Sequence, residues 1–298
     1  MKNHILWIIL LGTLALIITT QSKSGVGSFL FNSSLKITHP IKSIKNIAYG
    51  EKAWQQLNIY PQKNQLNAPV IVFIYGGGWN QGTKEQYHFV ADGLTRKGYV
   101  VVIPDYIKYP EGQFPTFVED IALATAWVKN NIESYGGNAN QILLAGHSAG
   151  AHTGALLVTD QHYLNAVGLS TAAVMGFVGL SGPYNFTPKD PQYIKTFGRE
   201  NFKTMKVNNH VKGKTPPIKL IHGEGDTTVD KLNFDTFRNK LQATNNQVST
   251  QLLGKDIGHV DTVLKIHPWF AGEVDVAVEI DTFFKKLLRQ PQISTSSK

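Results

Sequence analysis

The chain has 298 residues, of which 42% are hydrophobic and 17% are charged, so it can bury a sizeable core and is not an intrinsically disordered chain. It contains no cysteine, which excludes a disulfide framework, a thiol nucleophile and a cysteine-ligated metal site. The formal charge is +8, but the lysines are scattered without a block of like charges, so we expect no nucleic-acid partner.

The N-terminus has the pattern of an export signal. Lys2 and His4 precede an apolar run over residues 5–18, and a polar stretch follows. This run is shorter than the roughly 20 residues that cross a bilayer. The pattern predicts a signal peptide over residues 1–22, with a membrane anchor through residues 5–20 as the alternative. We therefore expect an exported protein that is periplasmic, secreted or attached to the membrane.

The remaining chain divides into three predicted parts. Residues 23–43 are rich in small and polar residues and predict a linker. Residues 44–290 are predicted to form one domain, and residues 291–298 a polar tail. The domain opens with two predicted strands, Ile44–Tyr49 and Trp54–Tyr60, joined by a short turn that suits an antiparallel hairpin.

Strands and helices then alternate. The predicted strands are Val70–Tyr75, Tyr99–Ile103, Gln141–Ala145, Ala173–Leu180, Ile218–His222 and Val248–Leu253. The predicted helices are Thr83–Lys97, Thr116–Ser134, Ala149–Thr159, Leu232–Ala243 and Ala271–Arg289. Only residues 183–214, with three prolines and several aromatic residues, interrupt the alternation. The order predicts one doubly wound α/β domain, with helices on both faces of a mostly parallel sheet.

A nucleophile motif lies between a predicted strand and a predicted helix. Gly146-His147-Ser148-Ala149-Gly150 has the form G-x-S-x-G, and its strand–turn–helix setting is the one this motif requires. The turn lifts Ser148 to the carboxyl edge of the sheet, and it leaves the Ala149 N–H free at a helix start. An inert serine in a glycine-rich turn is the alternative.

A serine nucleophile needs a base, which should follow an acid later in the chain. His259 lies shortly after the predicted strand Val248–Leu253, at the carboxyl edge, and we prefer it to its rival His267. His147 stands next to Ser148 in the motif and cannot reach back to it in the required geometry.

The acid candidate is Asp226, in a glycine-rich turn after the predicted strand Ile218–His222. Its expected role is to accept the second ring N–H of His259, which fixes the tautomer of the imidazole. Asp230 and Glu224 are rivals, and ordinary turn chemistry is the alternative reading of Asp226.

Three glycines follow the first buried strand, in Tyr75-Gly76-Gly77-Gly78-Trp79. They let the backbone approach a reacting carbonyl, so we expect an oxyanion hole made by the N–H groups of Gly77, Gly78 and Ala149. The glycine spacing that cradles a phosphate is missing.

The substrate-binding candidates are aromatic. They are Trp79 beside the glycines and Tyr184 and Phe186 in the irregular segment, where they could line a pocket, form a small lid or pack against the sheet edge.

Taken together, these motifs resemble the α/β-hydrolase carboxylesterases, and most closely the group that is similar to hormone-sensitive lipase and to feruloyl and isoprenylcysteine esterases. The resemblance covers about residues 44–288 and implies the α/β-hydrolase fold, an eight-stranded sheet, no metal and no cofactor. Two positions depart from the family pattern. Tyr75 replaces the usual histidine, and Asp105-Tyr106-Ile107 replaces Asp-Tyr-Arg, with Lys108 next. We expect Tyr75 to anchor the glycine loop and Asp105 to pin a loop rather than to act in catalysis.

The function predicted from the sequence is a serine carboxylesterase that hydrolyses small-molecule esters with short- to medium-chain or aryl acids through an acyl-enzyme. An amidase or aryl-formamidase with the same residues is one alternative, and a non-catalytic binding module is another.

Overall fold

The computed structural model describes residues 41–62 and 65–289. The predicted signal peptide or anchor, almost all of the linker and the polar tail lie outside these residues. Within the described ranges, no helix has the length and apolar character needed to cross a bilayer.

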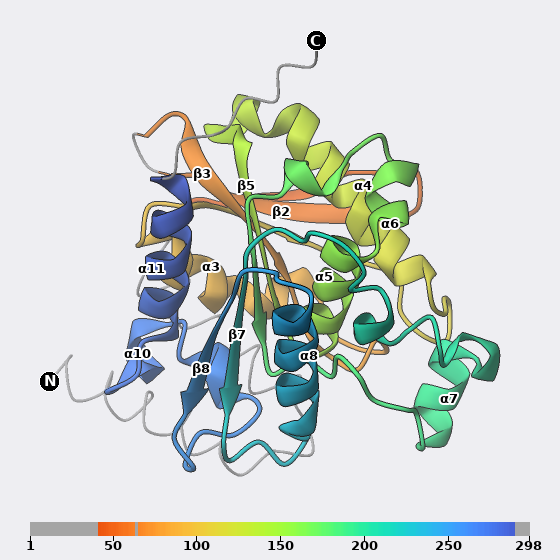
Figure 1. Cartoon of the computed structure of the whole chain (residues 1–298). Coiled ribbons are helices and arrows are strands. Elements are labelled where there is room, and N and C mark those ends of the chain that lie inside the picture. Colours follow the sequence, from red (N-terminus) through yellow and green to blue (C-terminus); the bar gives the residue numbers. More distant parts are fainter. Residues whose placement is uncertain (1–40, 63–64, 290–298) are drawn as a thin grey trace, which may run out of the picture.

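An eight-stranded sheet forms the centre of the domain, in the order β1-β2-β4-β3-β5-β6-β7-β8 (Figure 1). Its strands are β1 (Ile44–Ala48), β2 (Gln56–Tyr60), β3 (Ala68–Ile74), β4 (Val100–Pro104), β5 (Gly137–His147), β6 (Phe177–Leu180), β7 (Ile218–Gly223) and β8 (Val248–Leu253). The first hairpin pairs antiparallel and joins β4 antiparallel, whereas β3 to β8 pair in parallel. The expected α/β-hydrolase architecture is confirmed.

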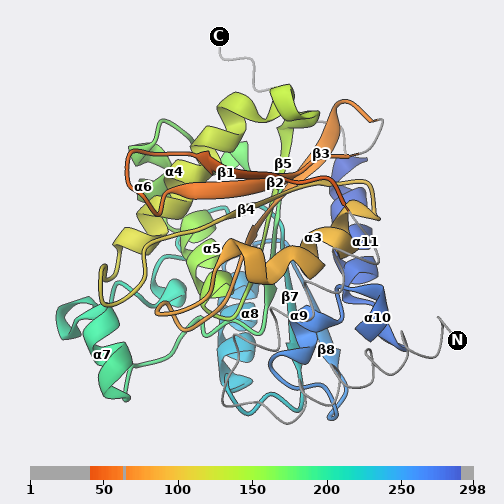
Figure 2. The ribbon, with the colours of Figure 1, turned by 180° about the vertical axis from the view of Figure 1, so that it is seen from behind.

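Helices cover both faces of the sheet (Figures 1 and 2). The helix α3 (His88–Thr95), with the 3₁₀ turn η1 (Lys84–Tyr87) before it, lies on the same face as α11 (Val276–Leu288). The other face carries α4 (Thr116–Asn131), α5 (Ala149–Thr159) and α8 (Leu232–Ala243). The remaining helices are α6 (Gln161–Ala166), α7 (Pro191–Phe197), α9 (Asp261–Leu264) and α10 (Pro268–Ala271), with 3₁₀ turns η2 (Ile132–Tyr135), η3 (Thr171–Ala173), η4 (Arg199–Asn201) and η5 (Val207–Asn209).

The central strands are buried on both faces, which explains their continuous apolar runs. Every residue of β4 is buried, and so are the residues of β5 from Ile142 to His147. Because β5, β7 and β8 run in parallel, their carboxyl ends meet at one edge of the sheet. The turns that follow these strands are the ones that carry Ser148, Asp226 and His259.

Several observed elements differ from the predicted ones. The short helices α6, α7, α9 and α10 were not predicted, and the helix expected over Thr83–Lys97 is divided into η1 and α3. The strand expected from Ala173 begins only at Phe177 because η3 precedes it. The last helix, expected from Ala271, begins at Val276. Gly272 has a φ of 55° after α10, and the Asp275 side chain accepts the Val278 N–H at 3.0 Å, which caps α11.

Candidate active site

The turn between β5 and α5 holds Ser148 in a conformation that few residues adopt. Its φ and ψ are 54° and −122°, and such a backbone costs about 1–3 kcal/mol. The flanking glycines are required by space. A Cβ on Gly146 would lie 2.5 Å from the Gly150 carbonyl oxygen, and a Cβ on Gly150 would overlap the Ile74 carbonyl oxygen. The close packing of β3, β5 and α5 around these glycines thus holds Ser148 in its strained backbone conformation.

The structure brings Ser148, His259 and Asp226 into one hydrogen-bonded chain. The Nε2 atom of His259 lies 2.8 Å from the Ser148 Oγ, and its Nδ1 atom lies 2.7 Å from the Asp226 Oδ2. An ionised carboxylate only accepts hydrogen bonds, so Nδ1 carries the ring proton and donates it to Asp226. Nε2 is then the free acceptor for the Ser148 hydroxyl, which is the tautomer that a general base requires.

Backbone donors hold the Asp226 carboxylate in place. Its Oδ1 atom accepts the N–H groups of Thr228 and Val229, each at 2.9 Å, and its side chain is fully buried. Burial alone raises the pKa of Asp226, but the hydrogen bonds from His259, Val229 and Thr228 and the nearby imidazole outweigh it and lower the pKa to about 2. Asp226 is therefore ionised at neutral pH.

The predicted oxyanion donors surround the same serine. A Cβ on Gly76 would lie only 2.9 Å from the Ser148 Cβ, so the glycine loop packs directly against Ser148. Gly77 and Gly78 have φ values of 135° and 58°, and within the described residues neither N–H donates to a backbone acceptor. Ala149 is the first residue of α5, where the N–H has no partner inside the helix.

Tyr75 anchors the glycine loop, as expected for the residue that replaces histidine. Its hydroxyl donates to the Asp105 Oδ1 at 2.6 Å, and its ring stacks on Tyr106 with a centroid distance of 4.8 Å. Asp105 also accepts the Lys84 ammonium at 2.8 Å, so it pins the loop and η1 together. The Lys108 ammonium lies over the Tyr75 ring, 5.4 Å from its centroid.

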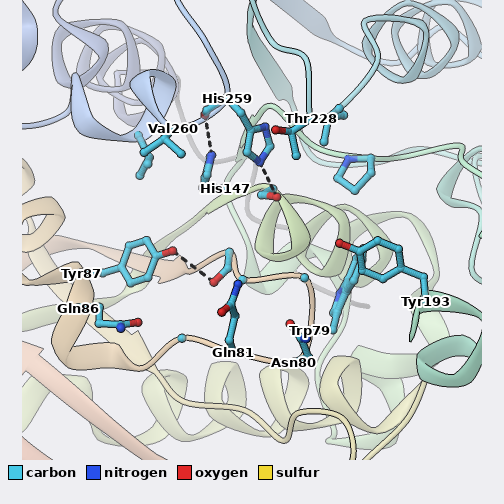
Figure 3. Close-up of a pocket in the computed structure, with 18 of the residues that line it drawn as sticks. Trp79, Asn80, Gln81, Gln86, Tyr87, His147, Tyr193, Thr228, His259 and Val260 are labelled. Atoms are coloured by element: carbon cyan, nitrogen blue, oxygen red, sulfur yellow. Dashed lines mark hydrogen bonds between the residues drawn. The ribbon is translucent and has the colours of Figure 1, made fainter. Parts of the chain in front are cut away.

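Ser148 opens into a cavity of about 770 Å³, which suits a small-molecule substrate. Figure 3 shows two sides of it, with Trp79, Tyr193 and Thr228 on one side of His259 and Gln86, Tyr87 and Val260 on the other. We call the first side the aromatic arm. It is lined by Trp79, Pro183, Phe186, Gln192 and Tyr193.

In the aromatic arm, Trp79 and Phe186 have nearly parallel rings with centroids 5.8 Å apart, and Tyr193 stands edge-on to both. Two of the three substrate-binding candidates, Trp79 and Phe186, thus line the cavity. The third, Tyr184, does not. It is 1% exposed and packs on Phe237, so the structure removes it from the substrate-binding candidates.

The rival catalytic residues have other partners. His267 is fully buried, and its Nε2 atom contacts the Asp92 carboxylate at 2.8 Å. Asp230 accepts the Leu232 N–H at 2.8 Å near the start of α8, and Glu224 is exposed. The Nε2 atom of His147, within the nucleophile motif, lies 3.0 Å from the His259 carbonyl oxygen. Burial and the neighbouring imidazole of His259 lower the pKa of His147 to about 3, so its ring is neutral.

The second side of the cavity was not predicted. This helical arm is lined by Gln86, Tyr87, Phe89, Val260, Val263 and Leu264. Its residues come from η1, α3 and the His259 loop with α9, which pack on one another. Little in the sequence indicated this arm beyond the apolar Val260 next to His259. Which side of a short helix faces the cavity depends on tertiary packing, and the sequence pattern does not reveal it.

No group of three or more potential ligands is arranged to hold a metal ion in the part of the chain that the structure describes. The donors around Ser148 are a hydroxyl, an imidazole, a carboxylate and backbone N–H groups, and the imidazole and carboxylate are already paired with each other.

The chain is similar in sequence to a known protein family and to several curated proteins. A profile of the BD-FAE family matches residues 57–241. The isoprenylcysteine α-carbonyl methylesterase ICME of Arabidopsis thaliana is 31% identical over 67% of this chain and 52% of its own length. The kynurenine formamidase of Salmo salar is 28% identical over 60% of this chain and 57% of its own. The chain thus spans about half the length of the curated relatives it matches.

Among solved structures, an inhibited esterase B from Lactobacillus rhamnosis has a similar fold. Its TM-score is 0.77 at 19% identity, and the match covers 94% of this chain and 97% of that one.

Proposed function

The chain belongs to the BD-FAE family of α/β-hydrolases, and from this premise we propose that it is a serine carboxylesterase with Ser148 as its nucleophile. The observation that carries the proposal is the hydrogen-bonded chain from Ser148 through His259 to Asp226, whose first two members line an open cavity. The names of the related proteins, a methylesterase and an esterase, support the reaction class.

The proposed reaction follows from these atoms. His259 Nε2 takes the Ser148 proton while the Oγ atom attacks the ester carbonyl, and the resulting oxyanion accepts N–H groups of Gly77, Gly78 and Ala149. The imidazolium, stabilised by the Asp226 carboxylate, then gives its proton to the leaving alcohol, and an acyl-enzyme remains. Water, activated by the same imidazole, attacks the acyl-enzyme and releases the acid.

The cavity supports small esters as substrates. Its volume of about 770 Å³ lies within the usual range for ligand sites, and its lining residues lie on two sides of His259. We propose that the acid and alcohol parts of the substrate occupy one arm each. Short- to medium-chain or aryl acids fit this space.

Hydrolysis of p-nitrophenyl esters of increasing acyl length tests the proposal. The wild-type protein should hydrolyse short esters and react with a fluorophosphonate probe, whereas Ser148→Ala should lose both properties. Undiminished hydrolysis by Ser148→Ala would remove the serine from its role. A wild-type protein that neither hydrolyses esters nor takes the probe would favour a non-catalytic binding module instead.

An aryl-formamidase is the second candidate, and the similarity to a kynurenine formamidase supports it. The same three residues would attack the formyl carbon. Rates on a matched pair of aryl ester and aryl formamide distinguish the two, because an esterase should prefer the ester and a formamidase the formamide.

A further inference from the structure

The peptide between Gly76 and Gly77 lies against the nucleophile and can turn. A Cβ on Gly76 would lie 2.9 Å from the Ser148 Cβ, which places this peptide beside the reacting oxygen. Gly77 has a φ of 135°, and glycine stands at both ends of the peptide, so its rotation meets no side chain of its own. A peptide with this freedom needs an external contact to fix its direction.

The Tyr87 hydroxyl supplies such a contact. It donates to the Gly76 carbonyl oxygen at 3.2 Å, as Figure 3 shows. In a planar trans peptide the carbonyl and the next N–H point in opposite directions. Holding the Gly76 carbonyl toward Tyr87 therefore directs the Gly77 N–H away from it. If the peptide turned over, the carbonyl oxygen would take the place of the donor and repel an oxyanion.

Other carbonyls of the loop have different partners, and the Gly77 carbonyl accepts the backbone N–H groups of Asn80 and Gln81 at 3.2 and 3.1 Å. The Tyr75 carbonyl accepts the Tyr106 hydroxyl at 3.0 Å, in the buried layer below the loop. The Trp79 carbonyl accepts the Tyr109 N–H at 2.9 Å. The Gly76 carbonyl is held from the helical arm, by a residue that itself lines the cavity.

Tyr87 is itself held in position. Its ring stacks on Tyr75 with centroids 5.2 Å apart, and it also contacts the rings of Phe73 and Phe89. Burial raises the pKa of Tyr87 to about 12, although its hydrogen bond to Gly76 works against this rise, so the hydroxyl keeps its proton at neutral pH. The donor is thus present and aimed before substrate arrives.

We propose that Tyr87 is a positioning residue of the oxyanion hole, whose hydroxyl locks the Gly76–Gly77 peptide with the Gly77 N–H toward the reacting carbonyl. The proposal rests on the esterase function proposed above. It assigns Tyr87 a role in the transition state rather than in the binding of the ground-state ester.

The test compares Tyr87→Phe with the wild-type protein on a short p-nitrophenyl ester. Loss of an oxyanion donor costs about 10²–10³ in kcat, and a donor that is only misdirected part of the time should cost about tenfold. We expect kcat to fall by this factor while KM stays within about twofold. The affinity for a trifluoromethyl ketone, which forms a tetrahedral adduct with the serine, should fall by the same factor as kcat/KM.

Tyr135→Phe is the matched control. Tyr135 lies in η2, packs on Trp127 and does not line the cavity, so its loss of a hydroxyl should leave kcat unchanged. All rates are normalised to the fraction of protein that a fluorophosphonate titrates, which removes unfolded protein from the comparison.

Two results would overturn the proposal while leaving the esterase function intact. One is a Tyr87→Phe variant with wild-type kcat and ketone affinity. The other is a change confined to KM, which would make Tyr87 a wall of the substrate site. Failure of the wild-type protein itself to hydrolyse esters and take the probe would instead remove the esterase function, and the role of Tyr87 with it.

Discussion

Replacing Asp226 with asparagine should disable the site through the tautomer of His259. The Oδ1 atom of Asp226 accepts two backbone N–H groups, from Thr228 and Val229. In Asp226→Asn only the amide oxygen can accept these donors, so the amide nitrogen must occupy the position of Oδ2, facing His259 Nδ1. Nδ1 then has to accept, and the ring proton moves to Nε2. The imidazole presents a donor to Ser148 where an acceptor is needed.

The magnitude follows from two contributions. A base held in the wrong tautomer lowers kcat by about 10⁴ in serine hydrolases of this kind, and we expect a loss of about 10³–10⁴, or roughly 4–5.5 kcal/mol of barrier. The carboxylate also stabilises the imidazolium.

Steady-state hydrolysis of p-nitrophenyl acetate measures the effect, with Asp226→Ala as the comparison. Alanine leaves either tautomer of His259 accessible, so the alanine variant should retain more activity than the asparagine variant, although it removes more atoms. Both should keep KM close to the wild-type value. An asparagine variant that is as active as the alanine variant, or more so, would refute the argument from the two backbone donors.

Three further results are expected. Gly150→Ala should lower the free energy of unfolding in urea by about 1–3 kcal/mol, because the new Cβ would overlap the Ile74 carbonyl oxygen; an unchanged denaturation midpoint would contradict this. His267→Phe should lower the free energy of unfolding by about 1–3 kcal/mol, because the buried Asp92 carboxylate loses its contact with His267 but keeps its pair with Arg96. The kcat per titrated site should stay within about twofold, and a large loss of kcat would argue for a role in the site. The pKa of Asp226 falls on folding from 3.8 to about 2, so its carboxylate stabilises the protein above about pH 4, and this contribution is lost as the pH falls toward 2. The melting temperature of the Asp226→Asn variant should therefore change less between about pH 4 and pH 2 than the melting temperature of the wild-type protein.

The parts of the site that local chemistry specifies could be read from the sequence. The turn at Ser148 needs small neighbours and a strand–turn–helix setting, both visible in the chain. The order of acid and base along a parallel sheet then favoured Asp226 and His259. In the structure His259 lies within hydrogen-bonding distance of both Asp226 and Ser148.

Aromatic residues were harder to place, because composition does not say where a ring points. Tyr184 seemed equivalent to Phe186 in the sequence, yet its ring fills space left by two glycines. A Cβ on Gly179 or Gly182 would run into it. Tyr87 was hidden for a different reason. Whether it faces the cavity depends on how η1 packs, and its partner is a backbone carbonyl that no sequence pattern marks.

The placement of the three predicted catalytic residues on separate strand ends has a consequence for how the protein becomes active. Ser148 and His259 are 111 residues apart, and His259 follows β8, which among the described strands lies at the edge of the sheet beside β7. Bringing such distant segments together is the slow part of building a parallel sheet. During refolding, the proposed esterase activity should therefore appear only once that outermost strand has docked on β7.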